Sequence, residues 1–541
     1  MDASRDAATD VADVLIIGAG ASGAAVAWRL GSKGFRVVCL EQGGWIPPQS
    51  YPISQPDWEL HRYTDFHPDP NLRGLPEDYP VENSESCFAP LMFNAVGGST
   101  IHWSAHFPRF HPSDFRVRSL DGVADDWPLT YEELEPFYDL NDRQIGVAGL
   151  VGDPAYPPKA ARQTPPLAIG SFGATLARGF DRLGWHWWVS DSAVISAPYG
   201  ENRQPCNYCG PCDIGCTRAA RSSADVTYWP RAIKDGVTLV TRARVREISV
   251  DNEGLATGAI YYDAAGRLHQ QRARVVVVAA NGIGTPRLLL NSRSRHFPDG
   301  LANRGGLVGK NLMYHPFAGV GGVFPELLDS TRGPIGSSLF SHEFYETDES
   351  RGYVRGFMLQ AVRQSGPVHT ALGGLVGQAV PWGPGHHRVF AERSSHMAYF
   401  GVMCEDLPDE RNEVVLDPNL VDGDGIPAPR VRYRLDANSE RMLDAGIARA
   451  RDALDAAGAT EVLVNRIVRP AGWHLLGTAR MGDDPNCSVV DRWGCAHDVR
   501  NLFIVDGSVF VTSAAVNPTT TIQALALRTA DYIDANRRNI V

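Results

Sequence analysis

The chain has 541 residues, of which 43% are hydrophobic and 21% charged, close to the averages of soluble globular domains. This composition excludes disordered, collagen-like and coiled-coil proteins, and the length suggests two or more domains. The formal net charge is −11, and no basic run offers the concentrated positive face that a nucleic-acid partner requires.

The sequence predicts no membrane or export segment. The first apolar stretch, Val11 to Ile17, runs directly into glycines and is far shorter than the roughly 20 residues of a membrane helix. Residues 1–10 are acidic and polar and lack the pattern of a secretory signal. We therefore expect no intrinsic membrane segment and a cytoplasmic chain as encoded, unless a partner subunit supplies export.

Residues 12–42 predict a βαβ unit: a buried strand, a glycine-rich turn, a small-residue helix and a second strand that ends at Glu41. Gly18, Gly20 and Gly23 fit G-x-G-x-x-G, which brings backbone and a helix N-terminus close to a pyrophosphate. Glu41 is placed to accept a hydrogen bond from a ribose hydroxyl. The motif predicts dinucleotide binding but does not choose between FAD and NAD.

The remaining elements indicate two kinds of sheet. Residues 43–90 are irregular, and a buried strand over 273–280 precedes a helix with Pro286 in its first turn. From about 316 to 470, short alternating segments predict an antiparallel sheet, followed by a helix over 439–457. The C-terminal strand and the amphipathic helix after it return the chain to the first domain.

Several motifs spread over nearly the whole chain resemble the glucose-methanol-choline (GMC) oxidoreductase family. They are VLIIGAGASG at the start, NAVGGSTIHW (94–103), AANGIGTPRLLLNS (279–292), VGKNLMYHP (308–316), WHLLGTARMG (473–482) and DGSVFVTSAAVNPTTTIQALA (506–526). Within the family, GTARMGDDP and NPTTTIQALALR look most like bacterial sugar and gluconate dehydrogenase large subunits.

The resemblance implies an α/β fold, in which an FAD-binding Rossmann-like domain carries an inserted substrate domain built on an antiparallel sheet. The FAD-binding domain would be discontinuous and comprise 1–50, 90–125, 215–315 and 470–541. Residues 51–89, 126–214 and 316–469 would form the substrate-binding domain, a lid and a cysteine-rich excursion.

The resemblance also implies the catalytic pair. His474 would act as the base that takes the hydroxyl proton while a hydride moves to the flavin, because a neutral imidazole accepts a proton near neutral pH. Asn517 would hydrogen-bond the substrate oxygen. His102 matches a histidine that some relatives bond covalently to the flavin, and here we expect packing beside a noncovalent flavin.

The other cofactor contacts follow from the matched motifs. Val245 would offer its backbone to adenine, Asp506 and Gly507 would lie near the ribityl-pyrophosphate, and 517–519 near the flavin ring. The full set of expected FAD-binding residues is Gly18, Gly20, Ala21, Ser22, Gly23, Glu41, Gln42, Asn94, Gly97, Gly98, Ser99, His102, Val245, Ala280, Asp506, Gly507, Asn517, Pro518 and Thr519.

Four of the nine cysteines, Cys206, Cys209, Cys212 and Cys216, follow the spacing C-x2-C-x2-C-x3-C, which is associated with iron–sulfur ligation. Thr217 stands where the bacterial ferredoxin run has proline. Some sugar dehydrogenases of the family carry a three-iron cluster in this region, and an iron–sulfur site is one prediction here. Disulfides, free thiols or another metal remain alternatives.

These features predict an enzyme that oxidises a hydroxyl group of a sugar-like or polyol substrate with FAD and passes the electrons to an external acceptor, such as a partner subunit. An oxidase of the same family that reduces O2 to H2O2 is the first alternative. A non-catalytic dinucleotide-binding protein is the second, although His474 and Asn517 argue against it.

Overall fold

A computed structural model describes residues 11–540, so the acidic stretch 1–10, in which the sequence predicts no export signal, lies outside the described residues. The predicted βαβ unit is present as β1 (Ala12–Ile17), α1 (Ala21–Gly31) and β2 (Val37–Glu41). All of β2 and nearly all of β1 are buried, as expected for inner strands of a parallel sheet.

The first large sheet is built around parallel strands in the order β17-β8-β1-β2-β5. β8 (Leu268–Val278) and β17 (Val499–Ile504) come from distant parts of the chain, and β5 (Thr238–Thr241) closes the other side. The antiparallel strands β6 (Arg244–Val250) and β7 (Ala256–Tyr262) extend from β8, and the short β16 (Cys495–Ala496) pairs with β17. This is the predicted Rossmann-like sheet.

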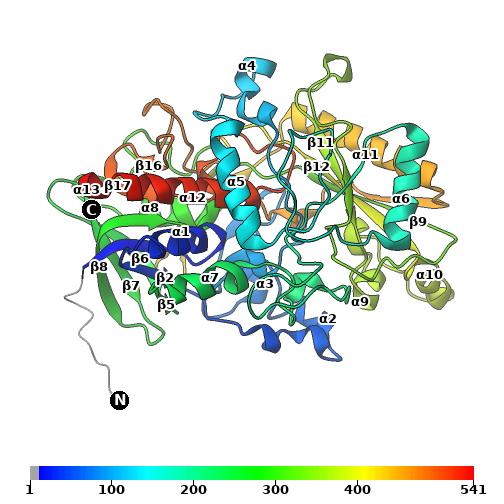
Figure 1. Cartoon of the computed structure of the whole chain (residues 1–541), viewed down its shortest axis with the longest axis horizontal. Coiled ribbons are helices and arrows are strands. Elements are labelled where there is room, and N and C mark those ends of the chain that lie inside the picture. Colours follow the sequence, from blue (N-terminus) through cyan, green and yellow to red (C-terminus); the bar gives the residue numbers. More distant parts are fainter. Residues whose placement is uncertain (1–10, 541) are drawn as a thin grey trace.

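Helices from both ends of the chain cover this sheet. α1 packs against the C-terminal α12 (Thr519–Ala535) and against α7 (Ala224–Lys234), and α12 also packs against α5 (Tyr131–Ile145). Figure 1 shows α1 in blue and α12 in red side by side. The C-terminal helix, which begins two residues after Asn517, is thereby fixed beside the helix that follows the glycine-rich turn.

The second large sheet has six antiparallel strands in the order β15-β9-β12-β11-β10-β4, which confirms the sheet predicted for the middle of the chain. Their bounds are β15 (Glu461–Asn465), β9 (Phe317–Val323), β12 (Met397–Cys404), β11 (Phe357–Val362), β10 (Leu339–Ser341) and β4 (Trp188–Val189). α11 (Ala437–Ala457) packs on this sheet and on α6 (Gly170–Leu183), at the right of Figure 1. The exact domain boundaries expected from the sequence stay a prediction.

The position of Pro286 differs from the sequence-based expectation. α8 (Asn281–Asn291) begins at Asn281, so Pro286 lies inside the helix and not in its first turn. Proline has no N–H to donate to the carbonyl of Gly282, but Thr478 Oγ1 donates to that oxygen at 2.8 Å. The helix therefore continues through the proline without leaving a buried carbonyl unpaired.

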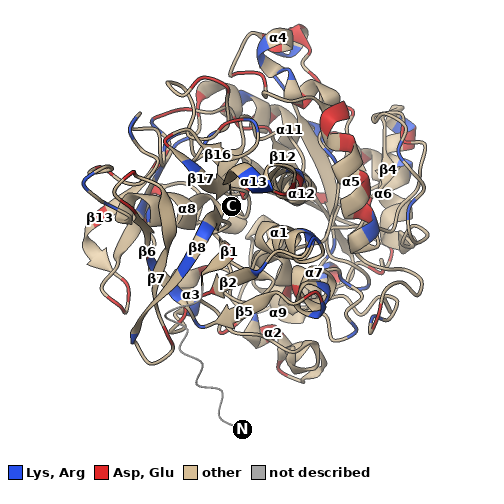
Figure 2. Cartoon of the chain, turned by 60° about the vertical axis from the view of Figure 1, so that its left-hand side comes forward, with Lys and Arg blue, Asp and Glu red and all other residues tan. Residues whose placement is uncertain are grey.

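α8 packs on a third, three-stranded sheet of β13 (Glu413–Val421), β14 (Pro427–Tyr433) and β3 (Glu82–Ser86). The segment 43–90 otherwise contains only short helices, among them α2 (Trp58–His61) and α3 (Pro70–Arg73). Basic and acidic residues are interspersed over the ribbon in Figure 2. Within residues 11–540, no helix is both long and apolar enough to cross a membrane.

Candidate active site

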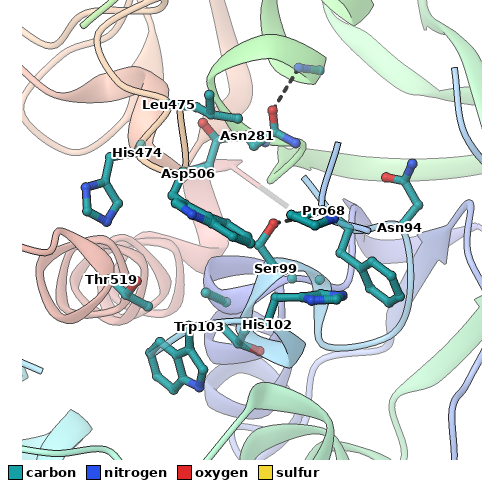
Figure 3. A pocket seen from close by; sticks show the side chains of 18 of the residues that line it. Pro68, Asn94, Ser99, His102, Trp103, Asn281, His474, Leu475, Asp506 and Thr519 are labelled. Carbon is teal, nitrogen blue, oxygen red and sulfur yellow. Dashed lines mark hydrogen bonds between the residues drawn. The ribbon is translucent and has the colours of Figure 1, made fainter. Parts of the chain in front are cut away.

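A cavity of about 570 Å³ lies at the carboxyl ends of the parallel strands and is also lined by residues of β9, β11 and β12 from the antiparallel sheet. Ligands of open α/β sheets bind at this edge. Every residue expected from the sequence to bind the cofactor or to act in catalysis lines the cavity, except Gly23 and Gly97. Figure 3 shows several of these side chains around the common space.

The glycine-rich turn permits unusually close backbone contacts. Gly18 has φ +103°, and a Cβ there would lie 2.4 Å from the carbonyl oxygen of Ala279. A Cβ on Gly98 would lie 2.9 Å from Cα of Gly20, so the loop 94–99 meets the turn directly. Gly23 supports the turn, since a Cβ there would lie 1.9 Å from Gly18 O. Only glycines fit this cradle.

The N-terminus of α1 faces the cavity, and no acidic or capping side chain of the protein occupies it. Gly20 precedes the helix, no side chain caps it, and its first turn contains no acidic residue. Free N–H groups at a helix N-terminus attract a negatively charged group such as a pyrophosphate. These features fit the phosphates of a dinucleotide.

Glu41 lies beside this turn at the end of β2. Its carboxylate accepts hydrogen bonds from Ala19 N and Gly43 N, both at 2.8 Å. Burial raises the pKa of Glu41 to about 7, although the two backbone donors act in the opposite direction. The side chain is thus fixed at the place where the Rossmann fold presents an acid to a ribose.

Asp506 follows β17 and ties three segments together. Its carboxylate accepts from Thr285 Oγ1 at 2.6 Å, from Ser508 N at 2.9 Å and from Asn281 N at 3.1 Å. Burial raises the pKa of Asp506 above its usual value. This residue holds the start of α8 and the loop after β17 at the cavity wall.

His102 is buried in the loop that continues from the glycines at 97 and 98. Its ring lies 4.2 Å from that of Phe93, edge to face, and its Nε2 has no hydrogen-bond partner. Burial lowers the pKa of His102 to about 3, so the ring is neutral at neutral pH. Gly97 turns the backbone at φ +99° without lining the cavity.

His474 contacts a second histidine that the sequence did not identify as a site residue. His474 Nδ1 and His315 Nδ1 are 2.9 Å apart, and the two rings are nearly perpendicular, at 85°. His315 Nε2 lies 2.9 Å from the carbonyl oxygen of Ala514. Burial lowers the pKa of His315 to about 4, and burial together with His315 lowers that of His474 well below its usual value.

Asn517 lines the same cavity just before α12. Its buried Oδ1 has no hydrogen-bond partner, although buried amide oxygens are nearly always paired. The adjoining Pro518 precedes the first helical residue, Thr519. An amide in this position is available to a bound molecule.

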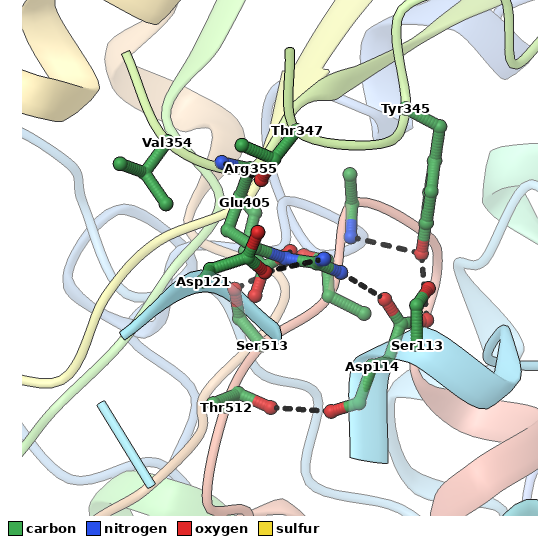
Figure 4. Close-up of polar contacts among 12 residues, drawn as sticks. Ser113, Asp114, Asp121, Tyr345, Thr347, Val354, Arg355, Glu405, Thr512 and Ser513 are labelled. Atoms are coloured by element: carbon green, nitrogen blue, oxygen red, sulfur yellow. Dashed lines mark hydrogen bonds and ion pairs between the residues drawn. The ribbon is translucent and has the colours of Figure 1, made fainter. Parts of the chain in front are cut away.

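The loop before Asn517 is fixed by buried polar contacts, shown in Figure 4. Thr512 Oγ1 donates to the carbonyl of Asp114 at 3.1 Å, and Ser513 Oγ donates to the carbonyl of Asp406 at 3.0 Å. The N–H of Ala515 donates to the hydroxyl of Tyr345 at 3.3 Å. The carbonyl of Ala514, which contacts His315, is held between these anchors.

Arg355 forms ion pairs with four carboxylates of this network, the most distant being Glu346 at 3.7 Å. Its guanidinium lies 2.6 Å from Asp114, 2.8 Å from Glu405 and 3.1 Å from Asp121 (Figure 4). The Arg355 side chain is 1% exposed, and those of Asp114 and Glu405 are fully buried. The network joins the segment around residue 114 to β11 and β12.

The cysteine run does not form the predicted ligand set. Within residues 11–540, no group of three or more His, Cys, Asp or Glu side chains is arranged to hold a metal ion, and all nine cysteines, which lie in this range, are unpaired. Cys209 is exposed, and Cys206 Sγ accepts from Tyr208 N at 3.4 Å. The iron–sulfur prediction gains no support, nor does the disulfide alternative.

Sequence reasoning also missed several polar residues of the cavity wall: Arg62, Trp103, Asp213, Arg363, Ser365 and His369. Trp103 ends the quoted segment NAVGGSTIHW, whereas the others lie in the irregular excursion, the cysteine-rich loop and the segment after β11, where no motif marks them. His315 could have been found, because it belongs to the quoted segment VGKNLMYHP.

Family models match three parts of the chain. Two described as GMC oxidoreductase match residues 188–317 and 408–526, and one described as an NAD(P)-binding Rossmann-like domain matches 16–78. A solved structure of Aspergillus oryzae formate oxidase, from a study of FAD modification, covers 99% of this chain and all of its own, with a TM-score of 0.65 and 17% identity.

Curated relatives match over nearly the whole chain. 2-Methyl-1,2-propanediol dehydrogenase of Mycolicibacterium austroafricanum is 44% identical over 98% of this chain and 97% of its own. The fructose dehydrogenase large subunit of Gluconobacter japonicus is 32% identical over 96% and 97%. Paromamine 6'-oxidase of Streptomyces fradiae is 30% identical over 96% and 91%.

Proposed function

The chain belongs to the GMC oxidoreductase family, and from that premise we propose that it binds FAD and oxidises a hydroxyl group of a polyol or sugar-like substrate. The observation that carries the proposal is that one cavity contains both the glycine cradle of the parallel sheet and a histidine whose ring is hydrogen-bonded to a second, buried histidine.

The proton arrangement follows from the hydrogen bonds. A carbonyl oxygen only accepts, so the contact with Ala514 requires the proton of His315 to reside on Nε2. Neutral His315 then has a lone pair on Nδ1, and His474 donates its Nδ1–H to that lone pair. His474 Nε2 is left unprotonated, and no group in residues 11–540 bonds it.

His474 therefore has the form that a general base needs. Its Nε2 takes the proton of the substrate hydroxyl, and the resulting imidazolium is stabilised because His315 accepts a charge-assisted hydrogen bond from Nδ1. Asn517 holds the substrate oxygen through its otherwise unpaired amide. Both side chains are partly exposed to the cavity, and the hydrogen bond to His315 fixes the orientation of the His474 ring.

The cradle supports FAD as the cofactor. Gly18 and Gly98 allow close backbone approaches that a Cβ would block, Glu41 is placed for a ribose, and the amide groups at the start of α1, which follows Gly20, suit a pyrophosphate. When bound, FAD supplies the acceptor for the hydride of the carbinol carbon. His102, neutral and buried, packs beside the flavin without a covalent bond.

We propose a dehydrogenase that passes its electrons to an external acceptor in place of O2. The 44% and 32% identical relatives are named dehydrogenases, the second as a large subunit, whereas an oxidase matches at 30%. For a dehydrogenase of this kind, the external acceptor is an electron-accepting partner subunit. An iron–sulfur cluster is left out of this proposal, because within residues 11–540 no group of three or more His, Cys, Asp or Glu side chains is arranged to hold a metal ion.

The test is anaerobic reduction of the purified, FAD-loaded protein by neutral polyols, followed by reoxidation with an artificial acceptor or with air. We expect the flavin absorbance to bleach with a polyol and to recover much faster with the artificial acceptor than with air. A folded protein that takes up no FAD, or whose flavin no alcohol reduces, contradicts the proposal. Rapid peroxide formation in air would favour the oxidase instead.

A further inference from the structure

One part of the cavity wall carries buried polar groups that have no partner. Arg62 Nε and Nη1, Arg363 Nε, His369 Nδ1, Ser365 Oγ and Trp103 Nε1 are all buried without a hydrogen bond. Their residues line the cavity, yet four of the five lie outside the segments that form the glycine cradle: Arg62 follows α2, and the other three lie just beyond β11. Buried polar groups are rarely left unpaired, so this wall is suited to a polar ligand.

Arg62 is the first residue of this polar wall. Its Nη2 donates to Asp213 Oδ1 at 2.6 Å, and Glu59 lies 3.9 Å from Nη1. The side chain is 10% exposed, and neither Nε nor Nη1 has a hydrogen-bond partner, although Nη1 is in ion-pair range of Glu59. The ion pair with Asp213 fixes the guanidinium while leaving two donor atoms for a ligand.

Arg363 and His369 continue this wall. Arg363 donates to the carbonyls of Asp329 at 2.8 Å and Ile169 at 2.7 Å, which orients the guanidinium and leaves Nε free. The N–H of His369 donates to Glu59 at 2.6 Å, which ties the helix α9 (Pro367–Ala371) to α2. Burial, and secondarily Arg62, lowers the pKa of His369 to about 4, so its free Nδ1 belongs to a neutral ring.

Each local cation has at least one carboxylate within ion-pair distance. Arg62 is paired with Asp213 and lies near Glu59, and Arg363 lies 3.5 Å from Asp329. A carboxylate on the ligand would add a buried negative charge without a spare cation to pair with it, which is costly. An uncharged ligand with several oxygen atoms satisfies the free donors without this cost.

We propose that Arg62, Arg363 and His369 bind the hydroxyl groups of an uncharged polyol beyond the carbon that is oxidised, and that they determine specificity for such extended substrates. This inference rests on the proposed function and adds the substrate class: neutral, with more hydroxyl groups than a simple diol, and without a carboxylate. The three residues contact the substrate but not the reacting carbon.

The experiment compares steady-state kcat and KM for 1,2-propanediol, erythritol, xylitol and the four-carbon acid erythronate. In the wild type we expect kcat/KM to rise from the diol to the longer polyols and to be lowest for erythronate. Arg363→Met and His369→Phe should each raise KM for erythritol and xylitol by about tenfold. Values for 1,2-propanediol should change by less than about twofold, because the short diol does not reach these residues.

Arg62 requires a variant that keeps the charge balance, so Arg62→Met is combined with Asp213→Asn, and flavin content and circular dichroism check folding. Arg29→Met is the matched control, since Arg29 forms an ion pair of the same 2.6 Å length with Asp531 and does not line the cavity. Equal losses for the diol and the polyols, or a preference for erythronate, would overturn the inference while the proposed function stands. A wild-type enzyme inactive on every alcohol would overturn both.

Discussion

His474 and His315 are 159 residues apart in the chain, yet their Nδ1 atoms lie 2.9 Å apart. Since Ala514 fixes the proton of His315 on Nε2, the pair has one consistent arrangement in its neutral form, with His474 as the donor. The loop that carries Asn517 thus also sets the tautomer of the proposed base. Both proposed catalytic groups depend on the same short segment, 512–517.

His474→Ala should abolish substrate oxidation but leave FAD bound, because the change removes a base and no part of the glycine cradle. We expect the rate of anaerobic flavin reduction to fall roughly 10²-fold or more, with normal flavin content. Stopped-flow absorbance measures the rate. A rate within a few-fold of wild type would show that another group takes the proton.

His315 should act as a positioning residue. His315→Leu removes the acceptor for His474 Nδ1–H, so both tautomers of His474 become available and its imidazolium loses a partner. We expect kcat to fall about tenfold or more while KM changes little. His315→Gln, whose amide oxygen still accepts, should recover part of the loss. If Leu and Gln give equal rates, His315 serves packing alone.

The pH profile tests the same pair. A base with a lowered pKa stays neutral as the pH falls. Activity is lost only when the pH approaches that lowered pKa and the base becomes protonated. Burial sets the pKa of His315 to about 4 and that of His474 well below its usual value. We therefore expect kcat/KM to be flat from about pH 8 down to about pH 5, without the inflection near 6.5 of an ordinary histidine. An inflection near 6.5 that disappears in His474→Ala would contradict this assignment.

The local parts of the fold were predictable from the sequence. The βαβ unit is recognisable within one stretch of 31 residues, 12–42, from its apolar strands, its glycines and Glu41 at the end of the second strand. The helix of residues 439–457 was also predicted closely, because Asp436 caps it and Gly458 ends it. Pro286 was misplaced, since a hydrogen bond from distant Thr478 decides how that helix continues.

The site was less predictable where it depends on tertiary contacts. The contact between His315 and His474 joins segments that share no local pattern. The cysteine run is a different case: its spacing is regular, but the iron–sulfur prediction gains no support, since Cys209 is exposed while Asp213, from the same loop, pairs with Arg62 in the cavity wall. Spacing along a loop does not determine the direction of its side chains.

Arg355→Met should destabilise the protein strongly. The change leaves the fully buried Asp114 and Glu405 without their cation, and breaking a buried ion pair typically costs about 3 to 5 kcal/mol. The partly exposed pair of Arg29 and Asp531 provides the control, since Arg29→Met should cost under about 1 kcal/mol. Chemical denaturation of the FAD-loaded proteins measures both. Comparable losses in the two variants would mean that the buried network contributes no more than a surface pair.

Gly98→Ala should impair FAD binding without unfolding the protein. The new Cβ would lie 2.9 Å from Gly20 Cα, so the loop 94–99 must move away from the glycine turn, and Gly98 also has φ +55°. Gly423→Ala is the control, because nothing lies within 4 Å of its Cβ position and its φ is not in the left-handed region. We expect the flavin content of Gly98→Ala to drop at least about tenfold, corresponding to about 1.4 kcal/mol of binding free energy, while Gly423→Ala keeps its FAD. Flavin absorbance per protein after dialysis gives the comparison. Full retention of FAD by Gly98→Ala would show that the cofactor does not depend on the close approach of these two loops.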